Sequence, residues 1–277
     1  RALPSALPEG DLPRPAEVVQ AVQQRLQGLP PAALALARGL AVAGAPADAS
    51  LAAAVMHKPV SALAEAWCSL ASSHLLSRGE FAPALVREVV LDGLPDALRR
   101  GLHAATARAM EAGAPEAPVD PAAVARHWEA AGQARRSVPW WWRAAAQAHR
   151  QWRARDAADT LARAIAHTEV NSPGLALALL LRQARVVVES DGIAAPLAPL
   201  GRALQLADSA PQRIQVLNRL AEVHFNRLMP DVSRQCAEQA LALALPAPAP
   251  SAWPMAAAEA VVRLHRALCL AGRAAEA

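Results

Sequence analysis

Tryptophan and arginine side chains, which can stack on a ligand or bind its anionic groups, gather in one window of this 277-residue chain. Residues 126–163 hold five of the seven tryptophans, together with eight arginines and only three acidic residues. Aromatic rings interleaved with guanidinium groups can stack on single-stranded nucleic acid and clamp it. Some residues of the window recur at helical spacing, so they would lie on one face of a helix, which favours burial of that face in a core instead. The expected buried stripe comprises Trp141, Ala145, Ala148 and Trp152.

A second face of the same helix is a candidate partner-binding surface. Trp140 cannot share the buried stripe, because three successive tryptophans span about 200° of a helix. Later helices carry polar residues that could continue this face as a groove for a peptide, another domain or a small inducer. The alternative is that these residues are simply solvated helix charges. The candidate partner-binding residues are Trp140, Arg143, Gln147, Arg150, Arg182, Arg185, Arg219 and Asn226.

No residue pattern indicates a catalytic, cofactor-binding or metal site. The eight histidines are scattered, and none falls in a His-Glu-x-x-His or Cys-x-x-Cys motif. No grouping of Ser, His and Asp stands out from chance. The chain contains no Gly-x-x-x-x-Gly-Lys-Ser/Thr motif, and its single lysine, Lys58, precedes Pro59. We therefore expect a non-catalytic chain without cofactor or metal.

The cysteines and the hydropathy pattern predict a cytoplasmic protein. Cys68, Cys236 and Cys269 are widely spaced in apolar helical runs, which favours small core residues in a reducing compartment. No apolar run reaches the roughly 18 residues of a membrane span, and no signal-peptide pattern opens the chain. The chain starts at Arg1 and ends inside an unfinished helical pattern. We expect it to be part of a longer protein.

Composition predicts an all-α protein with one small β-hairpin. Alanine and leucine dominate, tyrosine is absent and phenylalanine occurs twice, so residues that favour strands are sparse. The length exceeds what one core usually fills, which suggests two units. Trp128 would pack where the two units join.

The first unit has the outline of a winged-helix-like helical module at residues 16–112. Residues 1–15 form an irregular proline-rich segment before it. Short helices follow at 16–27, 32–42, after Asp48 as an N-cap, and at 60–72. Arg78-Gly79 then marks a tight hairpin. The helix at 60–72, which would be the recognition helix, has no Arg or Lys and carries Glu65, so we expect no direct DNA binding.

The second unit has the pattern of a tetratricopeptide-like α-solenoid at residues 122–277, after a proline-rich linker at 113–121. Paired helices are expected at 138–151 with 152–168, 174–190 with 192–208, and 211–228 with 231–245, followed by a single one at 252–271. Their second members share an alanine that recurs after 39 and 37 residues, at Ala164, Ala203 and Ala240. A period near 34 to 40 residues with small residues at helix crossings is typical of such repeats.

The run LVREVVLDGLPDALRRGLHAATARAMEA, which follows a Gly-Glu-Phe turn and precedes VARHWEAAG, carries a family resemblance. It resembles the region after the ATPase core in STAND-class bacterial transcriptional regulators of the LuxR and SARP types. One departure is Pro83, where the family commonly has a histidine. The resemblance is carried by Leu85, Val86, Arg87, Glu88, Leu94, Pro95, Arg99, Arg100, Leu102 and His103.

This resemblance implies a regulatory function. ATP and an ATPase core would belong to the full-length protein, outside this chain, and the repeats would sense an inducer or a protein partner and relay its binding to that core. The alternatives are a stand-alone scaffold that uses the solenoid groove and a helper region of a nucleotide cyclase or kinase.

Overall fold

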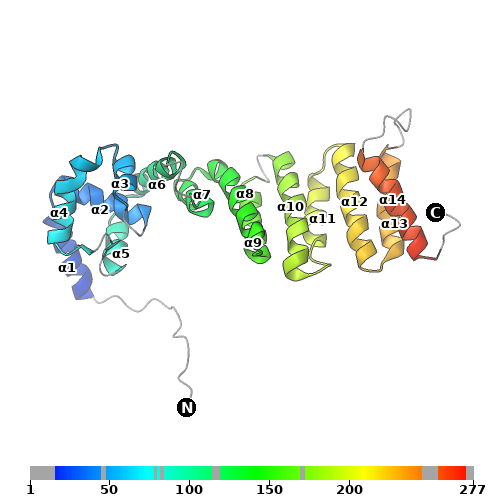
Figure 1. The fold of residues 1–277 in the computed structure, drawn as a ribbon, viewed down its shortest axis with the longest axis horizontal. Coiled ribbons are helices and arrows are strands. Elements are labelled where there is room, and N and C mark those ends of the chain that lie inside the picture. Colours follow the sequence, from blue (N-terminus) through cyan, green and yellow to red (C-terminus); the bar gives the residue numbers. More distant parts are fainter. Residues whose placement is uncertain are drawn as a thin grey trace, which may run out of the picture. The chain divides into compact units, whose positions relative to one another are not determined.

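The computed structural model describes residues 16–44, 48–77, 80–81, 84–113, 119–168, 172–244 and 255–272. Almost all of these residues are helical, which confirms the all-α prediction (Figure 1). The chain divides into two compact units. The first holds the described residues up to Val119 together with Arg126–Gln133, and the second holds 120–125 and the described residues from Ala134 onward.

Short helices build the first unit, and their ends follow local signals. Pro31 opens the second helix, where its missing N–H is not needed. The predicted N-cap of the third is confirmed, because the Asp48 carboxylate accepts a hydrogen bond from the Ser50 N–H at 2.8 Å. The helices are α1 (Ala16–Gln27), α2 (Pro31–Ala43), α3 (Ala49–Met56), the 3₁₀ helix η1 (Val60–Leu63), α4 (Ala64–Ser72), α5 (Ala84–Asp92) and α6 (Asp96–Glu111).

The predicted hairpin is present between α4 and α5. Strands β1 (Leu76–Ser77) and β2 (Glu80–Phe81) are antiparallel, with Leu76 opposite Phe81. The turn at 78–79 and Pro83 lie outside the described residues. A set of short helices followed by a small hairpin gives this unit its winged-helix-like order.

The core of the first unit surrounds α2. Leu36, Leu70 and Leu75 are fully buried, and the Arg87 guanidinium donates a 2.9 Å hydrogen bond to the Ala41 carbonyl, which ties α5 to α2. The expected core role of the cysteines is wrong for this unit, because Cys68 is exposed. Helix α4 buries Ala66 and Leu70 instead, and Cys68, two positions after Ala66, lies on the opposite face of the helix.

Paired helices build the second unit (Figure 1). Asp120 caps the helix that precedes the first pair, because its carboxylate accepts a hydrogen bond from the Ala122 N–H at 3.0 Å. The expected helix pairs are confirmed. The first pair begins at Ala134, four residues earlier than predicted. Residues 245–254 and 273–277 lie outside the described residues. The helices are α7 (Pro121–Ala130), which spans the division between the units, α8 (Ala134–Arg150), α9 (Ala154–Ala166), α10 (Pro173–Asp191), α11 (Leu197–Leu206), α12 (Ala210–Asn226), α13 (Pro230–Ala244) and α14 (Met255–Leu270).

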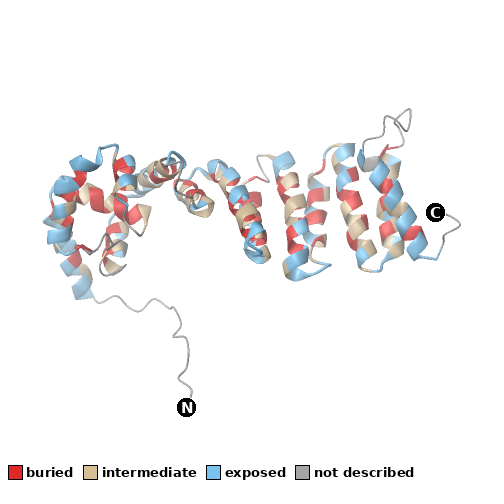
Figure 2. Ribbon diagram, viewed as in Figure 1, coloured by how far each residue is buried: buried red, intermediate tan, exposed pale blue. Residues whose placement is uncertain are grey.

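Small residues hold the paired helices together. Ala164, Ala203 and Ala240 are fully buried, as the repeat phase predicts. Figure 2 shows buried residues on the facing sides of these helices and exposed residues on their outer sides. An alanine lets two backbones approach closely, so the spacing of these alanines sets where each helix crosses its partner.

Cys236 is half-buried and Cys269 is exposed, so neither is the core residue that the sequence suggested.

The expected tryptophan stripe is correct except at its end. Trp141 and Trp128 are buried, together with Ala145 and Ala148. Trp152 is 90% exposed, because α8 ends at Arg150 and the 3.6-residue period no longer applies beyond it.

None of the helices in the described ranges combines the length and apolar character that crossing a membrane requires.

Candidate functional site

A cavity of about 430 Å³ is lined mainly by two first helices, α10 and α12, with one residue each from α8 (His149) and the second helix α11 (Leu200). We call it the first-helix groove. Four of the eight predicted partner-binding residues line it, so sequence reasoning and cavity geometry agree for this half of the set. These four are Arg182 and Arg185 of α10 and Arg219 and Asn226 of α12.

The floor of the first-helix groove is apolar. Ala184, Val186, Leu200 and Val223 line the cavity and are buried. Apolar lining with a few polar groups at the edge is the usual composition of a binding site, because burial of apolar surface supplies affinity and the polar groups supply orientation. The groove therefore offers both an apolar surface and charged groups to a partner.

The carboxylates in the first-helix groove already have partners. The His149 ring lies 3.0 Å from a carboxylate oxygen of Glu189. Glu222 pairs with Arg219 at 3.0 Å and with Arg263 at 3.2 Å. Three arginines, Arg182, Arg185 and Arg219, line the groove against these two carboxylates, so its net charge is positive.

Arg182 and Arg185 supply this positive charge. They are three residues apart on α10, so they share one face of the helix. Arg182 is half-buried and Arg185 is exposed. Within the described part of the chain, neither guanidinium group makes a hydrogen bond or an ion pair. An unpaired guanidinium beside an apolar surface favours a carboxylate, which it can bind through two parallel hydrogen bonds.

The other four predicted residues lie apart from the first-helix groove, on α8. The Arg143 guanidinium stacks 4.5 Å from the ring centre of Trp140, whose half-buried ring packs against the core. Gln147 is half-buried and Arg150 is exposed. The structure therefore divides the predicted surface in two, because α8 and the later first helices turn different faces to the groove.

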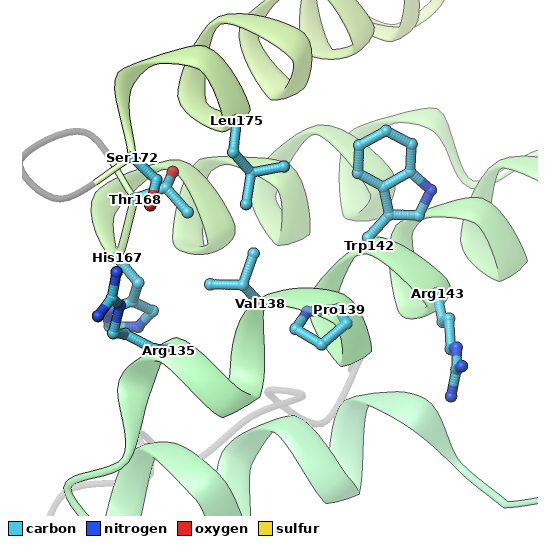
Figure 3. Close-up of a pocket in the computed structure, with 9 residues that line it drawn as sticks. All are labelled: Arg135, Val138, Pro139, Trp142, Arg143, His167, Thr168, Ser172 and Leu175. Carbon is cyan, nitrogen blue, oxygen red and sulfur yellow. The ribbon is translucent and has the colours of Figure 1, made fainter.

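A second cavity, of about 490 Å³, lies between the first half of α8 and the start of α10. Sequence reasoning did not find this site, which we call the α8–α10 pocket. Val138 and Leu175 extend toward each other across it (Figure 3). Its described lining consists of Arg135, Val138, Pro139, Trp142 and Arg143 of α8, His167 and Thr168 after α9, and Ser172 and Leu175 at the start of α10.

Two histidines of the first unit form a close pair. The Nδ1 atoms of His103 and His127 are 2.9 Å apart, so one ring donates a hydrogen bond to the other. Burial lowers the pKa of His103, and Arg99 lowers it further. The pKa of His127 is lowered to about 4, first by burial and then by the charge of His103. Both rings therefore favour the neutral form at neutral pH.

The basic window is less open to nucleic acid than its composition suggests. Arg155 pairs with Asp191 at 2.7 Å, and Arg153 pairs with Asp156 at 2.8 Å. The Arg163 guanidinium stacks 5.1 Å from the ring centre of Trp141. Guanidinium groups held in this way have less charge to offer phosphates.

Within the described ranges, no cluster of three or more His, Cys, Asp or Glu residues could hold a metal ion.

Comparison with known proteins adds no assignment to these sites. No protein-family model matches the chain, and no curated protein matches it in sequence. Among solved structures, the chain is similar to the crystal structure of BtubC (BKLC) from P. vanneervenii, at 15% sequence identity and a TM-score of 0.43. This similarity covers 94% of this chain and 85% of that chain. It is too distant to support a conclusion about fold or function.

Proposed function

We propose that this chain is a non-catalytic protein-interaction region, and that its first-helix groove binds an acidic peptide segment of a partner protein. The observation that carries this proposal is the pair of guanidinium groups of Arg182 and Arg185, which have no hydrogen-bond or ion-pair partner among the described residues and lie next to an apolar floor. The carboxylates of the same groove are already paired, so an incoming carboxylate meets a net positive surface.

A peptide suits this groove better than a compact ligand. The cavity is lined chiefly by two successive first helices, α10 and α12, and an extended chain along it could place alternate side chains toward the floor and the rim. Val188, which is 41% exposed, and Val223 offer contacts to apolar side chains, and Arg182 and Arg185 offer contacts to acidic ones. The partner segment would therefore alternate apolar and acidic residues.

The regulatory part of the proposal rests on the resemblance of residues 81–111 to STAND-class regulators. In a full-length regulator of this kind, peptide binding by the repeats would shift the populations of two states of an ATPase core. The peptide groove is the part of the proposal that the geometry of this chain supports. A stand-alone scaffold would use the same groove.

Binding of a fluorescein-labelled peptide of alternating leucine and glutamate, followed by fluorescence anisotropy, tests the groove. We expect replacement of both Arg182 and Arg185 by alanine to weaken binding at least about tenfold, because each substitution removes a charge-assisted hydrogen bond. Binding should also weaken as ionic strength rises, since the groups are exposed or half-buried.

Two controls make this experiment specific. Arg135→Ala removes an equally unpaired guanidinium from the other cavity and should leave peptide binding unchanged. A peptide in which glutamine replaces glutamate keeps the shape and should bind weakly to every variant. Equal binding by wild type and the double variant, or no binding of the acidic peptide, would contradict the proposal.

A further inference from the structure

We propose that the α8–α10 pocket binds a small monocarboxylate with an apolar chain, such as a medium-chain fatty acid. The pocket is separate from the first-helix groove, because the two share no lining residue. Its volume of about 490 Å³ falls within the range of about 300 to 1,000 Å³ that is usual for small-molecule sites.

Apolar side chains make up the middle of the pocket. Val138 is buried at its base, and Leu175 extends toward it from the opposite helix (Figure 3). Trp142 and Leu175 are 40% and 42% exposed, respectively, although both are large and apolar. A ligand chain that covered them would remove apolar surface from water, at about 25 cal/mol per Å².

The charge of the pocket selects an anion. Among its described lining residues none is acidic, whereas Arg135 and Arg143 are cationic. Arg143 stacks on Trp140, and its side chain points away from the centre of the pocket (Figure 3). Arg135 is exposed, and within the described residues it makes no hydrogen bond or ion pair. Arg135 is therefore the group that would bind the carboxylate.

The start of α10 adds to this preference for negative charge. Ser172 precedes the helix without capping it through its side chain, and Pro173 has no N–H, so the N–H groups of the first turn that can face a ligand are those of Gly174 and Leu175. The positive end of the helix dipole also favours an anion at this end. A carboxylate on an apolar chain satisfies both the cationic and the apolar parts of the lining.

Isothermal titration calorimetry with sodium decanoate, below its micellar concentration, tests the pocket, and decanol serves as the neutral ligand of equal chain length. We expect decanoate to bind wild-type protein, Arg135→Ala to weaken binding about tenfold, and Leu175→Asp to abolish it. Decanol should bind wild type and Arg135→Ala equally weakly, because it lacks the charge that Arg135 recognises.

Both substituted residues are at least partly exposed, and an aspartate in the first turn of α10 suits the helix dipole, so both variants should fold. Their thermal unfolding, followed by circular dichroism, checks this. Arg185→Ala, in the other cavity, is the matched control and should bind decanoate as wild type does. The proposal is wrong if decanoate does not bind, if Arg135→Ala binds it as tightly as wild type, or if decanol binds as tightly as decanoate.

Loss of decanoate binding in Arg135→Ala with retained peptide binding would separate this site from the peptide groove. The double variant of Arg182 and Arg185 should show the opposite pattern, in which peptide binding is weakened and decanoate binding is retained. Failure of the peptide proposal alone would leave the decanoate result intact, because different residues carry the two proposals.

Discussion

Two bulky apolar residues of the second unit have a left-handed backbone conformation that usually belongs to glycine. Trp152 and Leu228 have φ angles of 59° and 57°. They follow α8 and α12, where the N–H groups of Arg153 and Met229 donate hydrogen bonds back to carbonyls of the preceding helix at 3.0 and 2.9 Å. This is the common helix C-terminal motif, in which glycine avoids a steric cost of about 1–2 kcal/mol. The side chains of Trp152 and Leu228 are 90% and 74% exposed, so little core packing offsets that cost.

Trp152→Gly is expected to stabilise the second unit. Glycine adopts the positive φ without strain, and the gain of about 0.5–1 kcal/mol remains after the larger entropy that glycine loses on folding. Urea unfolding followed by circular dichroism would measure the change. Trp142→Gly, inside α8, is the comparison and should destabilise by about 1 kcal/mol or more, because glycine lowers helix propensity and the partly buried indole loses its contacts. A lower stability for Trp152→Gly would show that the Trp152 side chain has a structural role.

At the scale of the helices, the repeats depend on small residues at the crossings. Ala203 is fully buried in α11, whereas Ala198 of the same helix is exposed. Close packing leaves no space beside a fully buried alanine, because protein interiors are filled to the density of organic crystals. A helix therefore tolerates a larger residue on one face and not on the other.

Ala203→Leu should destabilise the second unit by about 1–3 kcal/mol, because three additional carbon atoms overpack the crossing. The same substitution at Ala198 should change stability by less than about 0.5 kcal/mol, since its side chain would extend into solvent. Thermal and urea unfolding would measure both variants. An unchanged unfolding curve for Ala203→Leu would refute the repeat phase that we derive from the alanine spacing.

At the scale of the whole molecule, each of the two units has its own hydrophobic core. The close histidine pair, His103 and His127, belongs to the first unit alone. An unfolded histidine has a pKa near 6.5, above the value of about 4 for His127 in the folded chain. The unfolded state therefore binds more protons between these two pH values, and folded stability falls as pH decreases through this window.

Calorimetric unfolding between pH 7 and pH 4 checks this acid sensitivity. The first unit of wild-type protein should lose stability as pH falls from about 6.5 to about 4, and His127→Gln should lose less because glutamine does not titrate. Glutamine can still exchange a hydrogen bond with His103. His265→Gln, in the second unit, should leave the first unit unchanged. Equal pH dependence in wild type and His127→Gln would exclude the pair as its source.

Local signals in the amino-acid sequence specify the helices and their order. Caps such as Asp48 and Asp120, and the period of the core alanines, act through neighbouring residues, so they can be read without knowing the fold. The same local information predicted Arg182 and Arg219 as surface residues on successive first helices. It failed at Trp152, because a helix end interrupts the period from which its burial was inferred.

Which distant side chains meet depends on the tertiary packing and cannot be inferred from local sequence signals. Val138 and Leu175 contribute to one pocket, and His103 contacts His127, because the fold brings together residues of different helices. The carboxylates of the first-helix groove have partners, whereas Arg182 and Arg185 have none among the residues that the structure describes. Residue types alone do not contain this distinction. Such contacts depend on the angle and distance at which helices cross. These quantities follow from the packing of whole faces, to which every residue of the interface contributes.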